Sequence, residues 1–275
     1  MVVQHNLQAA NTNRQLGITT SAQAKSTEKL SSGYKINRAA DDAAGLSISE
    51  KMRSQIRGLN KASSNAQDGV SLVQTAEGAL NETHSILQRM NELATQAANG
   101  TNTSVDRSAI RAELDQLTSE INRIQSTTQF NTMNLLDGTF SGATKQMKLQ
   151  VGALSGQSIN FSIANMCATK IGLETALSVS TFTKAGSYMK AVQDAIEVVS
   201  KQRSAMGAIQ NRLEHTIANL DTTSENTQSA ESRIRDTDMA SEMVTYSKNN
   251  ILAQAGQSML AQANQSTQGV LSLLQ

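Results

Sequence analysis

The chain has 275 residues, of which 3% are aromatic, and it contains neither tryptophan nor proline. Its aliphatic positions are separated by Gln, Asn, Ser, Thr and Ala, which lack the bulk for a wide globular core, and the absence of proline favours long unbroken helices. A formal net charge of +1 provides no broad field for nucleic acid, and no apolar run approaches the roughly 20 residues of a membrane span.

The first predicted element is a helix over residues 4–32. Its apolar stripe consists of Leu7, Ala10, Leu16, Ala24 and Leu30. A single helix cannot bury such a stripe on its own. Its low charge and many polar uncharged residues are typical of a segment that orders only when a partner covers it.

Three further helices are predicted from apolar residues that recur in steps of three and four. One runs from Leu46 to Ala98, and at 1.5 Å per residue it would be about 80 Å long. A second follows the Asn99–Gly100 break, with its seam at Ile110, Leu114, Leu117, Ile121 and Ile124. The third runs from Tyr188 to Leu220. We expect these three seams to pack together as a bundle.

Residues 139–186 break the helical pattern. Glycines punctuate this stretch, and the runs Met147–Val151 and Ile159–Ile163 are short enough for strands. The second run alternates apolar and polar residues, so we predict a β-hairpin between the helices. The pattern assigns no element to most of Cys167–Gly186.

The last predicted helix covers residues 239–274 and carries a second unburied stripe. Its members are Met239, Met243, Tyr246, Leu252, Ala255, Met259, Ala263, Val270 and Leu273. The two end helices are expected to pair with each other and with copies from other chains. The alternative is an intramolecular helix pair that merely closes the bundle.

The predicted fold is therefore mainly α. It is a long antiparallel helical bundle or coiled coil with a small β-hairpin region, and the terminal helices form an inner coiled coil. We expect three segments: residues 1–40 and 236–275 form the inner domain, and residues 41–235 form a helical rod with the hairpin around 139–186.

No residue pattern supports catalysis, a metal site or a cofactor. His5, His84 and His215 are far apart, and neither a phosphate loop nor a nucleophile elbow occurs. The pair Asp41–Asp42 and the residues Asp236 and Asp238 are expected in loops or at helix caps. The single Cys167 excludes an internal disulfide. We therefore predict a protein that is not an enzyme.

Three motifs, in order along the chain, closely resemble those of bacterial flagellins. They are Leu30–Ser49, Phe130–Gly138, and a C-terminal group made of Ser232–Met243, Asn250–Gly256 and Met259–Gln265. The chain departs from the usual pattern at Tyr34 and Arg38, where flagellins have Leu and a small residue. Only about fifty residues separate the helical halves, too few for a typical outer domain, so a thin, smooth filament is expected.

The resemblance implies a subunit that polymerises into the flagellar filament for motility. It also implies uncleaved export through the flagellar type III apparatus to an extracellular location, in agreement with residues 1–30, which lack a signal-peptide pattern. The implied partners are further copies of the chain, an export chaperone, and hook-associated and cap proteins, with neither nucleic acid nor membrane insertion. The assembly residues are Leu7, Leu16, Leu30, Met243, Leu252, Met259, Val270 and Leu273, and the chaperone would bind Leu252, Met259 and Leu260.

A further implied site is a recognition face for a host Toll-like receptor. Flagellins sensed by animal hosts present a Gln-Arg-x-x-Glu-Leu face, which matches Gln88, Arg89, Glu92 and Leu93 here. Glu113, on the neighbouring predicted helix, is a weaker candidate. The plain alternative for these residues is an ordinary solvated helix face.

Two other functions remain open at this point. A hook–filament junction protein would share the terminal helices but would form a ring. A secreted helical binding module would keep its self-association when residues 1–30 and 240–275 are removed, whereas a filament subunit would lose it.

Overall fold

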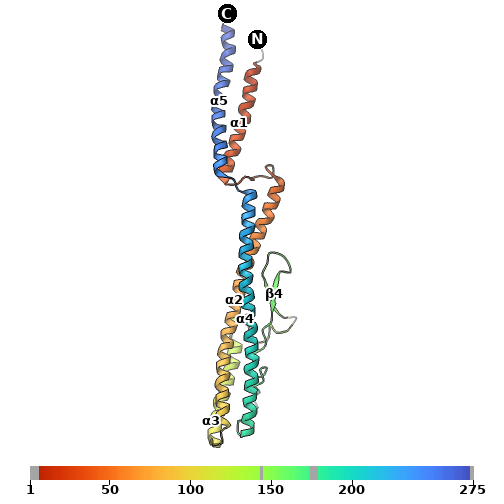
Figure 1. Ribbon diagram of the computed structural model, residues 1–275, viewed down its shortest axis with the longest axis vertical. Coiled ribbons are helices and arrows are strands. Elements are labelled where there is room, and N and C mark those ends of the chain that lie inside the picture. Colours follow the sequence, from red (N-terminus) through yellow and green to blue (C-terminus); the bar gives the residue numbers. More distant parts are fainter. Residues whose placement is uncertain (1–5, 143–144, 174–178, 273–275) are drawn as a thin grey trace. The chain divides into compact units, whose positions relative to one another are not determined.

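The computed structural model describes residues 6–142, 145–173 and 179–272, with side chains as far as residue 266. Five helices and four short strands follow one another along this part of the chain (Figure 1). The helices are α1 (Leu7–Ser32), α2 (Ala43–Ala97), α3 (Ser104–Thr127), α4 (Phe182–Arg235) and α5 (Met239–Ser272). The chain forms two compact units, one of residues 1–54 and 225–275 and the other of residues 55–224.

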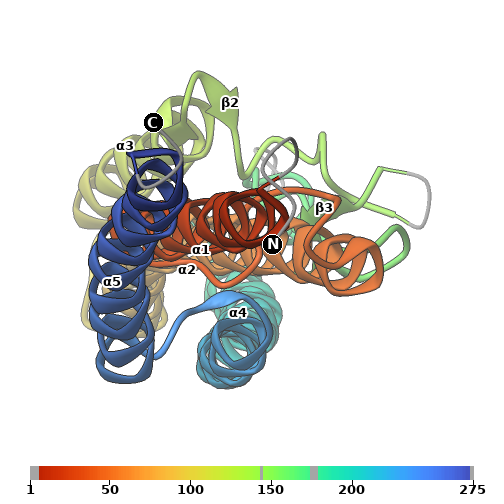
Figure 2. The same cartoon turned by 90° about the horizontal axis from the view of Figure 1, so that it is seen from above.

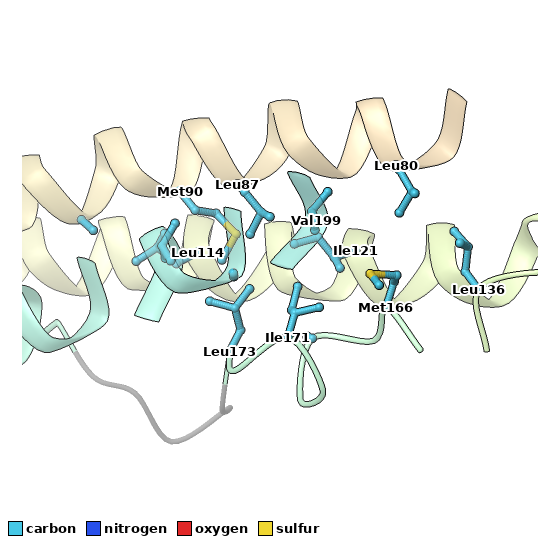
Figure 3. Packing of buried hydrophobic residues seen from close by; sticks show 14 of the residues in the cluster. Leu80, Leu87, Met90, Leu114, Ile121, Leu136, Met166, Ile171, Leu173 and Val199 are labelled. Atoms are coloured by element: carbon cyan, nitrogen blue, oxygen red, sulfur yellow. The ribbon is translucent and has the colours of Figure 1, made fainter. Parts of the chain in front are cut away.

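The core of the 55–224 unit lies between α2, α3 and α4, as the three seams predicted. Leu87 and Met90 of α2 face Leu114 of α3 (Figure 3). The segment after Cys167, which the sequence left unassigned, closes this core. Its buried residues are Ala168, Ile171, Leu173 and Val179, and residues 174–178 lie outside the described part of the chain. This irregular segment therefore covers the core that the three helices form.

Helix α4 extends well beyond its predicted end at Leu220. Between Leu220 and Ile234 the only aliphatic residue is Ala230, so the sequence offers no apolar seam there. Hydrogen bonds take the place of apolar contacts. Ser224 Oγ donates to Asn60 Oδ1 (2.7 Å). Sequence periodicity cannot detect a helix that packs through polar pairs.

The predicted β-hairpin is confirmed as β3 (Met147–Gln150) and β4 (Ser158–Phe161), paired antiparallel. It lies directly against α2 at two glycines. A Cβ on Gly58 would lie 2.8 Å from Ala153 Cβ, and one on Gly69 would meet Leu149. The hairpin can approach the helix this closely only because those side chains are absent.

A second, smaller hairpin was not predicted. It pairs β1 (Gln129–Phe130) with β2 (Met133–Asn134) across a two-residue turn. Both turn residues have positive φ, 48° at Asn131 and 63° at Thr132. Such a turn favours glycine, and Thr gives no sequence signal for it.

In the other unit, α1 and α5 lie side by side and run in opposite directions (Figures 1 and 2). Asn6 caps the start of α1, and Gly33 ends it in the left-handed conformation, with φ of 77°. Both terminal helices are therefore confirmed, with bounds close to those predicted.

Candidate functional site

The contact between α1 and α5 is a coiled-coil seam built from small and polar residues. On α1, with Ala22, Glu28 and Lys29 also partly buried beside them, partly or fully buried positions recur in steps of three and four: Ala9, Thr12, Leu16, Thr19, Gln23, Ser26 and Leu30. On α5 the same spacing gives Glu242, Tyr246, Asn249, Ala253, Gly256, Leu260 and Ala263. This alternation is the heptad signature of helices that wind around each other.

Two polar contacts fix the register of this helix pair. Asn6 Nδ2 donates to the carbonyl oxygen of Ala263 (3.0 Å) at one end. Lys29 Nζ lies 3.8 Å from Glu242 Oε2 at the other. Between them, a Cβ on Gly256 would lie 3.2 Å from Leu16 Cδ1, so glycine allows the helices to approach.

Eight of the larger apolar residues of the two helices are exposed, and we call these eight the outer apolar face. Its members are Leu7, Ile18, Met239, Met243, Val244, Ile251, Leu252 and Met259. Leu7 is 77% exposed and Ile251 67%. A shallow groove on α5, lined by Met243, Val244 and Ile251 with Ala240, Ser247 and Lys248, lies within this face. An exposed apolar surface of this extent is typical of a contact with another protein.

The structure sorts the predicted assembly residues into two groups. Leu7, Met243, Leu252 and Met259 lie on the outer apolar face, whereas Leu16 and Leu30 belong to the α1–α5 seam. The side chains of Val270 and Leu273 lie outside the described part of the chain. The intramolecular helix pair that stood as the alternative is thus present, and it leaves most of the large apolar side chains uncovered.

Sequence reasoning missed Ile18, Val244 and Ile251. Val244 and Ile251 are seven residues apart and line the groove on α5 together with Met243, so they form one stripe opposite the seam. Their spacing could have revealed a second apolar face on α5.

The segments that join the terminal helices to α2 and α4 are tied to each other. The amide of Lys35 donates to the carbonyl oxygen of Arg235 (2.7 Å), and that of Thr237 donates to Gly33 (2.9 Å). The Tyr34 ring lies 4.8 Å from the Arg235 guanidinium, which also donates to Glu50 Oε1 (2.9 Å). Tyr34, one of the two departures from the usual flagellin pattern, therefore has Arg235 as its partner.

Arg38, the other departure from the usual flagellin pattern, pairs with Glu28 of α1. Its Nε lies 2.9 Å from Glu28 Oε1, and both side chains are exposed. This second departure therefore also has a partner, although an exposed ion pair contributes little to stability.

Most aspartates of the three motifs accept hydrogen bonds from backbone amides, whereas Asp236 accepts from the hydroxyl of Ser232. Asp42 accepts from the amide of Gly45 at the start of α2, and Asp238 accepts from two amides in the first turn of α5. Asp41 accepts from the amides of Asn37 and Arg38, and these bonds lower the pKa of its carboxyl group. The expected loop and capping roles are confirmed for Asp41, Asp42 and Asp238.

The residues of the expected receptor face lie on α2 and α3. Arg89 donates through Nη2 and Nε to Glu113 Oε1 (3.0 and 3.2 Å), and through Nη1 to Glu92 Oε2 (3.2 Å). These carboxylates raise the pKa of Arg89. Gln88 Nε2 lies 3.0 Å from His84 Nε2. The structure thus brings Arg89, Glu92 and Glu113 together on an exposed surface.

Leu93 does not belong to that surface. It is 2% exposed and packs in the core of the 55–224 unit. The placement of Leu93 in the expected recognition face is therefore wrong, because its buried side chain is not available for contact.

In residues 6–142, 145–173 and 179–272, no three His, Cys, Asp or Glu side chains gather as a metal site would require. Among the helices as far as they are described, none combines the length and the apolar character of a membrane span.

Comparison with known families and proteins accounts for nearly the whole chain. The family described as bacterial flagellin N-terminal helical region matches residues 3–141, and the bacterial flagellin C-terminal helical region matches residues 189–274. The chain is similar to a flagellin of Halalkalibacterium halodurans (55% identical) and to one of Bacillus subtilis (50%). It is also similar to a flagellar filament core protein of Treponema maltophilum (50%). In all three comparisons the match covers 100% of each chain.

Two solved structures are similar in fold. The crystal structure of Bacillus cereus flagellin is 32% identical, covers 57% of this chain and 88% of its own, and superposes with a TM-score of 0.51. A putative flagellar hook-associated protein from Vibrio parahaemolyticus gives a TM-score of 0.60 over 71% of this chain and 100% of its own. At 15% identity, the second likeness concerns the fold alone.

Proposed function

This chain belongs to the bacterial flagellin family, and we infer from this membership and from its outer apolar face that it polymerises into the flagellar filament. It is a structural subunit for motility and not an enzyme. The observation that carries the inference is that α1 and α5 pair through small and polar residues while Leu7, Val244 and Ile251 stay exposed. Other copies of the chain are the partners that cover them.

The two alternatives have less support. The full-length relatives at 50–55% identity are flagellins and a filament core protein, whereas the likeness to a hook-associated protein extends to the fold only. A helical binding module does not account for an apolar face on both chain ends. We further propose that residues 1–40 and 236–275 line the inner tube of the filament and that residues 41–235 form the shell around it.

One substitution tests the assembly function in the full chain. Ile251→Asp places a charge on the outer apolar face and is expected to stop addition to filament seeds, because burying an unpaired carboxylate is costly. Ile251→Val is the matched control and should polymerise. Electron microscopy and sedimentation after seeding measure both, with circular dichroism as a check on folding. Polymerisation of the Asp variant at the control's rate, or only short rings from the unaltered protein, would contradict the proposal.

We propose that the subunit is exported uncleaved and that a chaperone holds α5 on the way. Leu252 and Met259 are exposed and available for it, whereas Leu260 is partly buried in the seam with α1. A chaperone that binds all three must therefore displace α1. Hook-associated and cap proteins are proposed partners of the same terminal helices. Hydrogen exchange tests this displacement. The chaperone should slow exchange at the amides of α5 and speed it at those of α1.

We also propose that a host Toll-like receptor recognises the Arg89 cluster. Arg89, Glu92 and Glu113 form a connected polar cluster in which the two carboxylates hold the guanidinium in place, and Gln88 lies beside it on α2, paired with His84. Arg89→Ala in the soluble monomer is expected to reduce receptor signalling. Arg123→Ala is the matched control, because Arg123 makes a similar exposed pair with Glu120 on α3. Equal signalling by the two variants would count against this site.

A further inference from the structure

The methionines of this chain differ sharply in their access to solvent. Met239, Met243 and Met259 on α5 are 50%, 55% and 52% exposed, and all three belong to the outer apolar face. Met90, Met166 and Met206 are at most 1% exposed. Figure 3 shows Met90 and Met166 among the aliphatic side chains of the core. The same side chain thus occurs in two environments, and the accessible group lies where subunits are expected to meet.

Exposed methionine reacts with peroxides without help from an enzyme. The thioether sulfur attacks one peroxide oxygen, the O–O bond breaks and an S–O bond forms. With hydrogen peroxide, the departing hydroxide takes up the proton that the transferred oxygen loses, and water is the product. Sulfur is oxidised by two electrons and the peroxide is reduced by two. The product is a polar sulfoxide, which a methionine sulfoxide reductase can reverse.

We propose that Met239, Met243 and Met259 form an oxidation-sensitive site that controls assembly. Peroxide converts them to sulfoxides in the free subunit, and the oxidised subunit no longer adds to a filament. The inference rests on the proposed function, because it takes the outer apolar face as the surface that becomes buried. A sulfoxide oxygen is a strong hydrogen-bond acceptor, and burial without a donor is unfavourable.

The position of Met243 makes this cost concrete. Met243 lines the groove on α5 with Val244 and Ile251, so a partner that fills the groove meets mostly aliphatic surface. Lys248 is the one cationic side chain that lines the groove among the residues described for it. Four of the six lining residues are apolar, namely Ala240, Met243, Val244 and Ile251, so a sulfoxide at Met243 enters a mostly apolar contact.

Two other oxidisable residues serve as internal controls. Met133 on β2 is 37% exposed but lies in the 55–224 unit, outside the outer apolar face. Cys167 is a partly buried free thiol. Measurements in a Cys167→Ser background remove thiol chemistry, and Met133 reports oxidation that should have no effect on assembly.

The first experiment measures the order of oxidation in the free subunit. The protein is treated with hydrogen peroxide, and peptide mass spectrometry follows each methionine. Met239, Met243 and Met259 are expected to oxidise about tenfold faster, or more, than Met90, Met166 and Met206, because access of the sulfur controls the rate. Equal rates in the two groups would overturn the proposal. In filaments the same three residues should be protected.

The second experiment measures assembly on filament seeds. Each sulfoxide that becomes buried is expected to raise the concentration of unpolymerised subunit by about tenfold, and reductase treatment should restore assembly. A triple variant with Met239→Leu, Met243→Leu and Met259→Leu keeps the apolar volume and should assemble equally well before and after peroxide. Met133→Leu should lose assembly after peroxide as the parent does.

The outcomes separate this inference from the function on which it rests. If untreated protein fails to add to seeds, the proposed function is wrong and this site falls with it. If untreated protein assembles and the oxidised protein assembles equally well, only the oxidation-sensitive site is wrong. Loss of assembly by the peroxide-treated triple Leu variant would also overturn it, because other residues would then be responsible.

Discussion

The guanidinium carbon of Arg235 lies 4.8 Å from the ring centroid of Tyr34, and the backbones of the same two segments are hydrogen-bonded. Arg235 thereby joins the segment after α1 to the segment before α5. A cation–π contact at a partly exposed site contributes about 0.5–1 kcal/mol. Both residues lie in the same compact unit. The contact therefore holds the two connecting segments together within that unit.

Tyr34→Leu is expected to loosen this connection. Loss of about 0.5–1 kcal/mol should speed hydrogen exchange at the amides of Lys35 and Thr237 roughly two- to fivefold. Arg38→Ala is the control, because the exposed pair with Glu28 should contribute little. Exchange that is unchanged in the Tyr34 variant would mean that the backbone hydrogen bonds alone hold the two segments.

Thr132→Gly is expected to stabilise the 55–224 unit by about 0.5–1 kcal/mol. Thr132 is β-branched and has φ of 63°, a conformation that glycine adopts without strain. The relief outweighs the greater flexibility of glycine in the unfolded chain. Urea unfolding measures the difference. Thr101→Gly, in a loop with ordinary φ, should instead destabilise, and the same sign in both variants would refute the strain at Thr132.

Substitution of two glycines of α2 by alanine should change the stability of the protein in opposite directions. Gly78→Ala meets nothing within 4 Å and should stabilise by about 0.5–1 kcal/mol, as alanine does in helices. Gly58→Ala places a methyl group 2.8 Å from Ala153 Cβ and 3.2 Å from its Cα, and should destabilise by about 1 kcal/mol or more. Thermal unfolding compares the two. Addition of Ala153→Gly should recover part of the stability lost in Gly58→Ala. No recovery would mean that the new methyl group does not clash with Ala153 Cβ.

Tyr188 should make the 55–224 unit sensitive to alkali. Burial raises its pKa from 10.0 to about 12, although a hydrogen bond with Thr118 acts in the opposite direction. Because the folded pKa is raised, the stabilisation is fully present below about pH 10 and is lost as the pH rises toward 12. The loss is expected to be on the order of 1–2 kcal/mol. Urea unfolding of Tyr188→Phe across this interval should show a shallower decline, and an identical decline would contradict the assignment.

The sequence predicted most of the fold because apolar periodicity and packing coincide along most of α2, α3 and α4. It failed at the end of α4, where Ser224 and Asn60 pack through a hydrogen bond, and at β1–β2, where the turn residues are not glycines. The irregular segment over the core has no period to detect. For such segments, burial is decided by contacts distant in sequence, which no local pattern records.

Only part of the candidate site could be predicted, because contacts between helices that are distant in sequence decide which side chains are exposed. Hydrophobicity identified Leu7 and Leu16 alike, but only the pairing of α1 with α5 shows that Leu16 faces inward and Leu7 outward. Leu93 was misplaced because its motif includes a buried position. The adjacency of Arg89 and Glu113 needed the antiparallel packing of two helices. Residue type gives the chemistry of a site, and the partner helix decides which side chains are available for it.

The contact between Asn6 and Ala263 has a consequence for the order of events during synthesis. A ribosome releases α1 long before α5 exists, so the start of α1 at Asn6 has no partner until residue 263 has been made. Residues 55–224 can fold earlier, because their contacts lie within the part already produced. The full pairing of α1 with α5 therefore requires translation to have passed residue 263, and a chain that terminates before α5 never presents the assembled pair to its neighbours.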